Sequence, residues 1–224
     1  PFDVSPADIQ ASVIINAVVM KKEFMEKPEE ASRPFDSRRD GFLYSHGAAT
    51  LIIEDLETAL DRGAPIYGEV LGVKANANAN HLPSPGGDEQ AWVMSRLLES
   101  CGVAPEEVDY INCHATGTPA GDVKEIDAVK KTFGKHAYNL KLNAPKSMLG
   151  HTCWASPLVE TVGGLLQMKH GRLHPTTNID ELDPEVDLDV CKDGPVDYPV
   201  RLMLKNSFGF GGINCCSLIK RYEE

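Results

Sequence analysis

Apolar residues recur at helical spacing in several stretches of the chain. In residues 89–101, the apolar positions 94, 97, 98 and 101 fall on one helical face, and Gly102 follows as a stop signal. The same reasoning predicts helices at 56–62, 122–133 and 157–169, and a helix start at Ser5 and Pro6.

Shorter apolar or alternating runs lie between these helices. They predict strands at 48–53, 66–73, 108–113, 140–143, 201–205 and 215–221. Residues 74–88 are rich in Asn, Pro and Gly and predict a long loop of the kind that often lies over a binding site. Because strands alternate with helices, the pattern predicts an α/β layered fold, and the final strand pair predicts a mixed sheet.

Composition narrows the range of functions. The net charge of −11 over 224 residues disfavours nonspecific nucleic-acid binding, which depends on Lys and Arg. No apolar run approaches the roughly 20 residues that a membrane helix needs. The six cysteines have no CxxC spacing and no signal peptide precedes them, which indicates reduced thiols in a cytoplasmic protein. The chain opens at Pro1 as though within a longer sequence.

Three polar or glycine-rich segments follow predicted strands and carry the candidate chemistry. They are 114–122 (HATGTPAGD), 143–151 (NAPKSMLGH) and 206–214 (NSFGFGGIN). Together they offer His114, His151, Lys146 and two phenylalanines, but no obvious nucleophile. Taken alone, each histidine is as compatible with a structural role beside a turn as with catalysis.

The two histidines mean more as a pair. If both strand ends face one cleft, two Nε2–H groups could stabilise one developing oxyanion, as in acyl transfer or enolate formation. Lys146 could orient His151 through a carboxylate, for which Glu160 is the candidate. The alternative for Lys146 and Glu160 is an ordinary ion pair or two solvated side chains.

Other kinds of site fit less well. Phe208 and Phe210 lie among glycines and could cover an apolar tunnel, or they could be core residues of a glycine-rich hairpin. The phosphate-binding patterns GxGxxG and GxxxxGK are absent, and the His and Cys residues lack metal-ligand spacing. Cys113 should point away from the face that His114 shares, which leaves Cys153 as the one thiol to consider as a nucleophile.

The three segments resemble the C-terminal half of the β-ketoacyl-ACP synthases, the condensing enzymes of fatty-acid and polyketide synthesis. Residues 31–36 (ASRPFD) and 39–42 (RDGF) also resemble that family. The resemblance implies a thiolase fold, an α-β-α-β-α sandwich that is pseudo-duplicated. It also implies a decarboxylative Claisen condensation between an acyl group and a malonyl-type extender carried on an acyl carrier protein.

The resemblance also assigns roles to individual residues. His114 and His151 would hold the malonyl thioester oxygen, and Lys146 would order the second of them, with Glu160 as the acidic residue of the next helix. Thr116 and Thr118 would bind the phosphopantetheine arm of the carrier protein, and no other cofactor is implied. The remaining assignments are Phe208 and Phe210 lining the acyl pocket, and Asp122 and Glu125 as structural acids.

The family's nucleophilic cysteine would precede Pro1, so the chain resembles half of an enzyme. The partners implied are the missing N-terminal half, in the same or a separate chain, and the acyl carrier protein, with a homodimer or heterodimer of the whole. Membrane and nucleic acid are not implied. The segment 152–157 (TCWASP), the Ser45-His46-Gly47 run and Ala115 depart from the family pattern and suggest a polyketide-type branch, with Trp154 reshaping the site entrance.

Two alternatives remain open beside the condensing enzyme. One is a malonyl-ACP decarboxylase that lacks the nucleophilic cysteine, because two histidines alone can stabilise an enolate. The other is a non-catalytic partner subunit that determines chain length. Retention of both histidines and the lysine disfavours this last hypothesis.

Overall fold

A five-stranded mixed sheet forms the centre of the computed structural model, which describes residues 4–79 and 86–223. The strand order is β1-β7-β6-β2-β3, and β2 runs parallel to both β3 and β6, whereas β7 runs antiparallel to β1 and β6. These strands are β1 (Glu69–Ala77), β2 (Tyr110–Asn112), β3 (Lys141–Asn143), β6 (Leu202–Gly209) and β7 (Ile213–Lys220). A separate two-stranded sheet consists of β4 (Arg172–Leu173) and β5 (Val196–Asp197).

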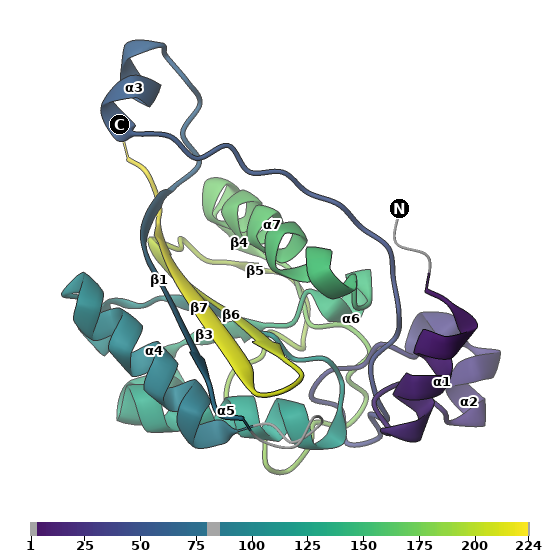
Figure 1. Cartoon of the computed structure of the whole chain (residues 1–224). Helices are drawn as coiled ribbons and strands as arrows, with labels where there is room; N and C mark the ends of the chain where they lie inside the picture. The colour runs from purple at the N-terminus through teal and green to yellow at the C-terminus, as the bar shows by residue number, and fades with distance from the viewer. Residues whose placement is uncertain (1–3, 80–85, 224) are drawn as a thin grey trace.

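Helices cover both faces of the central sheet (Figure 1). The α-helices are α1 (Pro6–Ile14), α2 (Lys22–Glu26), α3 (Leu56–Asp61), α4 (Gly87–Cys101), α5 (Pro119–Phe133), α6 (Lys146–Leu149) and α7 (Ser156–His170). Short 3₁₀ helices span Pro28–Glu30, Pro105–Glu107, Gly134–Asn139 and Cys153–Ala155. Helices α4 and α5 lie on one face of the sheet and α7 lies on the other. The α/β layered fold with a mixed sheet is therefore confirmed.

The apolar core divides into layers that follow these faces. The larger cluster packs α4 and α5, through residues such as Leu97 and Ile126, against Leu204 and Leu218 of the sheet. A smaller cluster on the α7 side includes Tyr110, Met168, Met203 and Ile219. β2 and the first five residues of β6 are buried throughout, as expected for parallel strands that are covered on both faces.

Local signals placed most helices correctly. Ser5 caps α1 in a capping box with Asp8, and Gly102 ends α4 in the left-handed conformation with φ 65°. The strand predicted at 66–73 is β1, which begins three residues later and continues to Ala77, into the segment expected to be loop. Part of that loop, residues 80–85, lies outside the described residues.

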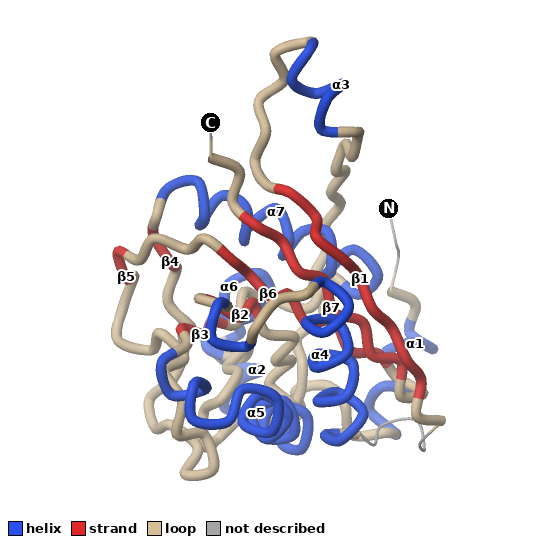
Figure 2. Tube along the Cα trace, turned by 90° about the vertical axis from the view of Figure 1, so that its left-hand side faces the viewer, coloured by secondary structure: helices blue, strands red, loops and turns tan. Residues whose placement is uncertain are grey.

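The strand predicted at 48–53 does not form. These residues have an extended, unpaired backbone in the described structure, and the side chains of Ile52 and Ile53 are 83% and 75% exposed. Because a strand requires a neighbouring strand for its hydrogen bonds, an apolar run alone does not produce one. This segment and α3 stand away from the rest of the molecule as an arm (Figures 1 and 2).

Within the described ranges 4–79 and 86–223, no helix combines the length and the apolar character that crossing a bilayer requires.

Candidate functional site

Three neighbouring parallel strands bring the candidate residues together at the carboxyl ends of these strands. Strand β2 lies between β3 and β6 and is parallel to both, so the carboxyl ends of all three meet there. His114 follows the end of β2, Lys146 follows the end of β3, and Phe208 lies near the end of β6. Segments separated by up to about 90 residues thus converge because of strand order alone.

The two histidine rings lie side by side at these strand ends. Their centroids are 6.0 Å apart, and the rings are nearly perpendicular, with an interplanar angle of 84°. Phe208 packs edge-on against His114 with centroids 5.7 Å apart, and Phe42 packs in the same way against His151 at 4.9 Å. The structure therefore joins both histidines and one of the two candidate phenylalanines in one cluster.

Two backbone hydrogen bonds, one through its N–H and one through its carbonyl, fix the position of His151. Its N–H donates to the Leu43 carbonyl at 2.7 Å, and its carbonyl accepts from the Ser45 N–H at 3.0 Å. Gly150, which precedes it, has φ 66°, and a Cβ there would lie 2.8 Å from the Ser45 Cβ, so the close approach requires glycine. The ring Nδ1 accepts from the Cys153 N–H at 3.0 Å and lies 3.2 Å from the Ser156 hydroxyl. The remaining hydrogen of the neutral ring therefore lies on Nε2.

Lys146 contacts His114 rather than His151, which corrects the prediction that it orders the second histidine. Its Nζ donates to the His114 carbonyl at 2.6 Å, lies 3.4 Å from the His114 Nδ1, and forms an ion pair with Glu160 Oε1 at 2.6 Å. The reason is topological, because β2 and β3 are adjacent and the lysine reaches across to the end of the next strand. The predicted pairing of Lys146 with Glu160 is confirmed, and His114 also carries its ring hydrogen on Nε2.

Burial keeps both imidazoles neutral. It lowers the pKa of His151 to about 3, and the positive charge of Lys146 adds to the effect. Burial, followed by the charge of Lys146, also lowers the pKa of His114 well below its ordinary value. Two neutral rings that each present Nε2–H can donate hydrogen bonds to a developing negative charge without giving up a proton.

The turn after His114 brings two hydroxyls together. Thr116 and Thr118 lie with their Oγ1 atoms 3.0 Å apart. Thr118 occupies the N-cap of α5, yet its side chain makes no capping hydrogen bond there. A Cβ at Gly121 would lie 2.4 Å from the Thr118 Oγ1, so the close approach of this hydroxyl to the helix requires glycine. The two hydroxyls therefore belong to the turn that directly follows His114.

Two buried acids hold the backbone of this turn. Asp122 accepts from the N–H groups of Phe35 and Gly117 at 2.9 and 3.0 Å, and burial raises its pKa to about 6. Glu125 accepts from the N–H groups of His114 and Ala115, each at 2.8 Å. These contacts fit the structural role expected for both acids.

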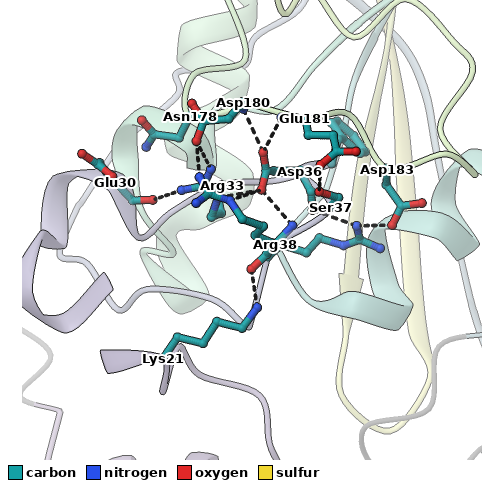
Figure 3. Close-up of polar contacts among 12 residues, drawn as sticks. Lys21, Glu30, Arg33, Asp36, Ser37, Arg38, Asn178, Asp180, Glu181 and Asp183 are labelled. Carbon is teal, nitrogen blue, oxygen red and sulfur yellow. Dashed lines mark hydrogen bonds and ion pairs between the residues drawn. The ribbon is translucent and has the colours of Figure 1, made fainter. Parts of the chain in front are cut away.

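A network of ion pairs and hydrogen bonds joins two loops of the chain (Figure 3). Arg33, which is 1% exposed, pairs with Asp36 at 2.9 Å and with Asp180 at 2.6 Å. Asp36 also accepts from the N–H groups of Asp180 and Glu181, at 2.8 and 3.1 Å. This network therefore joins residues 30–39 to residues 178–183.

Two further residues, Arg39 and Ser32, connect this network to the site. Arg39 pairs with Asp183 at 2.5 Å and donates to the carbonyls of Thr118 and Pro119 at the start of α5. The Ser32 hydroxyl donates to the Lys146 carbonyl at 2.5 Å. The ASRPFD and RDGF segments thus support the turn and the lysine.

Two other candidates are exposed on the surface. Phe210 is half-exposed in the turn between β6 and β7, and Trp154 lies in the 3₁₀ helix after His151 with 74% of its surface exposed. Burial raises the pKa of the Cys153 thiol, which disfavours the thiolate that a nucleophile requires. Cys113 is fully buried, and its pKa is also well above the ordinary value.

Sequence reasoning missed one charged residue of the cluster. Lys205 is 2% exposed, and its Nζ lies 2.6 Å from Glu160 Oε2. The signal that could have identified it is alternation along β6, which places Lys205 on the same face as Met203, toward α7. A lysine at an inward-facing strand position needs a buried partner.

Comparisons with known proteins show the family of this chain. The model of the beta-ketoacyl synthase C-terminal domain matches residues 67–180. The chain is 41% identical over 198 residues to the 3-oxoacyl-[acyl-carrier-protein] synthase 2 of Coxiella burnetii, and 42% identical over 200 residues to that of Synechocystis sp.. Each alignment covers 88% of this chain and 48% of the relative, so the chain spans about half the length of these curated relatives.

Solved structures show the same fold. A type II polyketide ketosynthase, in complex with its acyl-carrier protein and bound to the hexaketide, matches 98% of this chain with a TM-score of 0.94 and 32% identity. A beta-ketoacyl synthase from Burkholderia phymatum matches 99% with a TM-score of 0.92 and 31% identity. The chain covers 54% and 53% of these two structures. The thiolase-type fold is confirmed, and the chain belongs to the β-ketoacyl synthase family, whose C-terminal domain it contains.

Proposed function

We propose that this chain is the C-terminal half of a β-ketoacyl-ACP synthase, in which it carries the site of malonyl decarboxylation. The observation that supports this most directly is the pairing of two neutral imidazoles at 6.0 Å, each with its Nδ1 already occupied. Both rings can then donate through Nε2–H to the same thioester carbonyl oxygen. This arrangement suits the stabilisation of an enolate.

The proposed reaction begins with a malonyl thioester held by those two hydrogen bonds. The bond between the α-carbon and the carboxylate breaks, carbon dioxide leaves, and the electron pair passes into the enolate, whose oxygen carries the new negative charge. In the condensing enzyme, the α-carbon then attacks the carbonyl of an acyl thioester and expels the thiolate. Lys146 acts as the group that holds His114 in place.

The substrate arm is a phosphopantetheine on an acyl carrier protein. Thr116 and Thr118 offer two adjacent hydroxyls in the turn that follows His114, which suits hydrogen bonding to the amides of that arm. Phe208 covers His114 and suits the wall of the acyl pocket. Trp154 follows His151 by three residues and could set the width of the entrance, which remains a prediction.

The acyl-carrying cysteine is assigned to the complementary N-terminal half. The thiols at 113, 153 and 216 all have pKa values raised first by burial, so none of them is activated as a thiolate. An apolar surface suits contact with that half. It includes Leu158 and Leu166 on α7 and Ile52 and Ile53 in the arm, all exposed here.

The test is decarboxylation of malonyl-ACP by the complete synthase. We expect His114→Ala and His151→Ala each to lower the rate of carbon dioxide release by about a hundredfold or more, as for loss of an oxyanion donor. His170→Ala, which alters an exposed histidine at the end of α7, is the matched control and should leave the rate unchanged.

Thermal unfolding of each variant separates the catalytic role from a structural one. The proposal requires melting temperatures close to that of the unaltered protein. Undiminished decarboxylation in His114→Ala, or a loss of activity that only follows loss of folding, would refute the assignment.

A further inference from the structure

Lys205 occupies a position where an apolar side chain would suit the packing. It lies on the face of β6 that packs on α7, two residues after Met203, and the neighbouring buried residues on this side include Tyr110 and Met168. Removing an ammonium group from water into such a layer is costly unless the charge is paired. A buried lysine in this place therefore points to a role beyond packing.

The partner of Lys205 is the carboxylate that also holds Lys146. Glu160 binds Lys146 through Oε1 and Lys205 through Oε2, at 2.6 Å in both cases. All three side chains are at most 2% exposed. Lys205 also donates to the Asn206 carbonyl and to the Ser207 hydroxyl, the latter at 3.3 Å. Three groups, namely a carboxylate, a carbonyl and a hydroxyl, therefore hold the ammonium group of Lys205.

Other charged groups around the histidines come from α5 and the turn before it. Glu125 binds backbone N–H groups and the Asn206 amide at 2.9 Å, and Asp122 lies 3.7 Å from Arg39. Neither acid forms an ion pair with Lys146 or Lys205 in the described structure. The lysines therefore share one carboxylate, and Lys205 brings the second positive charge to the layer beneath the imidazoles.

We propose that Lys205 is a positioning residue for the decarboxylation assigned above. By holding the second oxygen of Glu160, it keeps that carboxylate from turning and so keeps Lys146 against His114. Its positive charge also favours neutral imidazoles over imidazolium ions, and it stabilises the negative charge of the enolate. The inference rests on the proposed function, because positioning matters only if the histidines act on a substrate.

The charge of Lys205 also acts on its neighbours. After burial and the charge of Lys146, it lowers the pKa of His114 and of His151 further. Burial opposes ionisation of Glu160, but the charges of Lys146 and then Lys205 hold the pKa of its carboxyl below the ordinary value. Removing the Lys205 charge should therefore raise all three pKa values.

The experiment compares Lys205→Met and Lys205→Arg in the complete synthase. Methionine fills a similar volume without charge, and arginine keeps the charge. For Lys205→Met, we expect the rate of malonyl-ACP decarboxylation to fall about tenfold or more, with KM nearly unchanged. We also expect the acid limb of its pH profile to move to higher pH. Lys205→Arg should recover the pH profile at least in part.

A second readout does not depend on turnover. The titration of His114 and His151 is followed by nuclear magnetic resonance with isotope-labelled histidine, and both pKa values should be higher in Lys205→Met. Lys131→Met removes a lysine from an exposed ion pair with Asp88 and serves as the matched control that should shift neither. If Lys205→Met does not fold, Lys205→Gln provides the same test.

The outcomes separate this inference from the proposed function. If the unaltered protein decarboxylates malonyl-ACP but Lys205→Met keeps its pH profile and both histidine titrations, the role of Lys205 is refuted and the proposed function stands. If the unaltered protein shows no decarboxylation, the proposed function fails. The histidine titrations alone then decide whether the Lys205 charge lowers the pKa values of the two imidazoles.

Discussion

At the residue scale, the site depends on which nitrogen of each imidazole carries the hydrogen. The backbone N–H of Cys153 occupies the Nδ1 of His151, and the Lys146 ammonium lies at the Nδ1 of His114. Both contacts use donors that the fold supplies before any substrate arrives. Preorganised donors of this kind avoid the cost of reorienting dipoles during the reaction.

A pH dependence of stability follows from the burial of His151. The pKa of this histidine is about 3 in the folded protein and about 6.5 in an unfolded chain, so unfolding takes up a proton between these values. Above pH 6.5, His151 is neutral in both states and does not lower the free energy of unfolding. As pH falls from 6.5 toward 3, the unfolded chain binds the extra proton and the free energy of unfolding decreases. In the complete synthase, His151→Gln should reduce the slope of unfolding free energy by about 1.4 kcal/mol per pH unit between pH 4 and 6. Urea unfolding at several pH values measures this, and an unchanged slope would mean that His151 titrates normally.

At the scale of elements, loops rather than helices hold the site together. Arg33 and Asp36 tie residues 30–39 to residues 178–183, and Ser32 extends the same loop to Lys146. The two arginines that reach Asp180 differ sharply in environment. Arg33 is almost fully buried, whereas the side chain of Arg38 is 44% exposed.

This contrast predicts different costs for two matched substitutions. Arg33→Met removes the guanidinium that pairs with the buried Asp36 at 2.9 Å and leaves only the more distant Arg38 guanidinium, at 3.9 Å, so it should lower the free energy of unfolding by about 3–5 kcal/mol. Arg38→Met removes an exposed ion pair and should cost about 1 kcal/mol or less. Chemical unfolding of the two variants checks the difference. Equal losses would show that the buried network does not determine the stability of this loop.

At the scale of the whole molecule, the described fold leaves apolar surface without cover. Exposed apolar side chains lie on α7 at Leu158 and Leu166, in the arm at Ile52 and Ile53, and along the edge strand β1 at Val70 and Val73. Large exposed apolar surface and an open sheet edge both favour association. A complementary half would bury much of this surface.

The 224-residue chain expressed alone should therefore associate with itself and bind a hydrophobic dye. Co-expression with the complementary half of a synthase should reduce both effects and raise the melting temperature. Size-exclusion chromatography and dye fluorescence provide the measurements. A monomer that unfolds cooperatively and does not bind the dye would contradict the proposed half-enzyme.

Sequence patterns predicted the elements well because capping, glycine stops and apolar spacing act over only a few residues. They also placed His114 and the lysine segment just past strands, since strand ends are visible locally. They failed at 48–53, where an extended segment has no neighbour to pair with in the described structure. They also paired Lys146 with the wrong histidine, because its contact with His114 depends on β2 and β3 lying side by side.

The sequence by itself thus determined the alternation of helices and strands, the polar segments at strand ends and the resemblance to a family. Only the tertiary structure decided which of those groups meet. It placed the two imidazoles at 6.0 Å, set Lys146 on His114, and put Lys205 on the same carboxylate as Lys146. The physical reason is that local propensities act between neighbours in the chain, whereas burial and charge act through space between residues that strand order brings together.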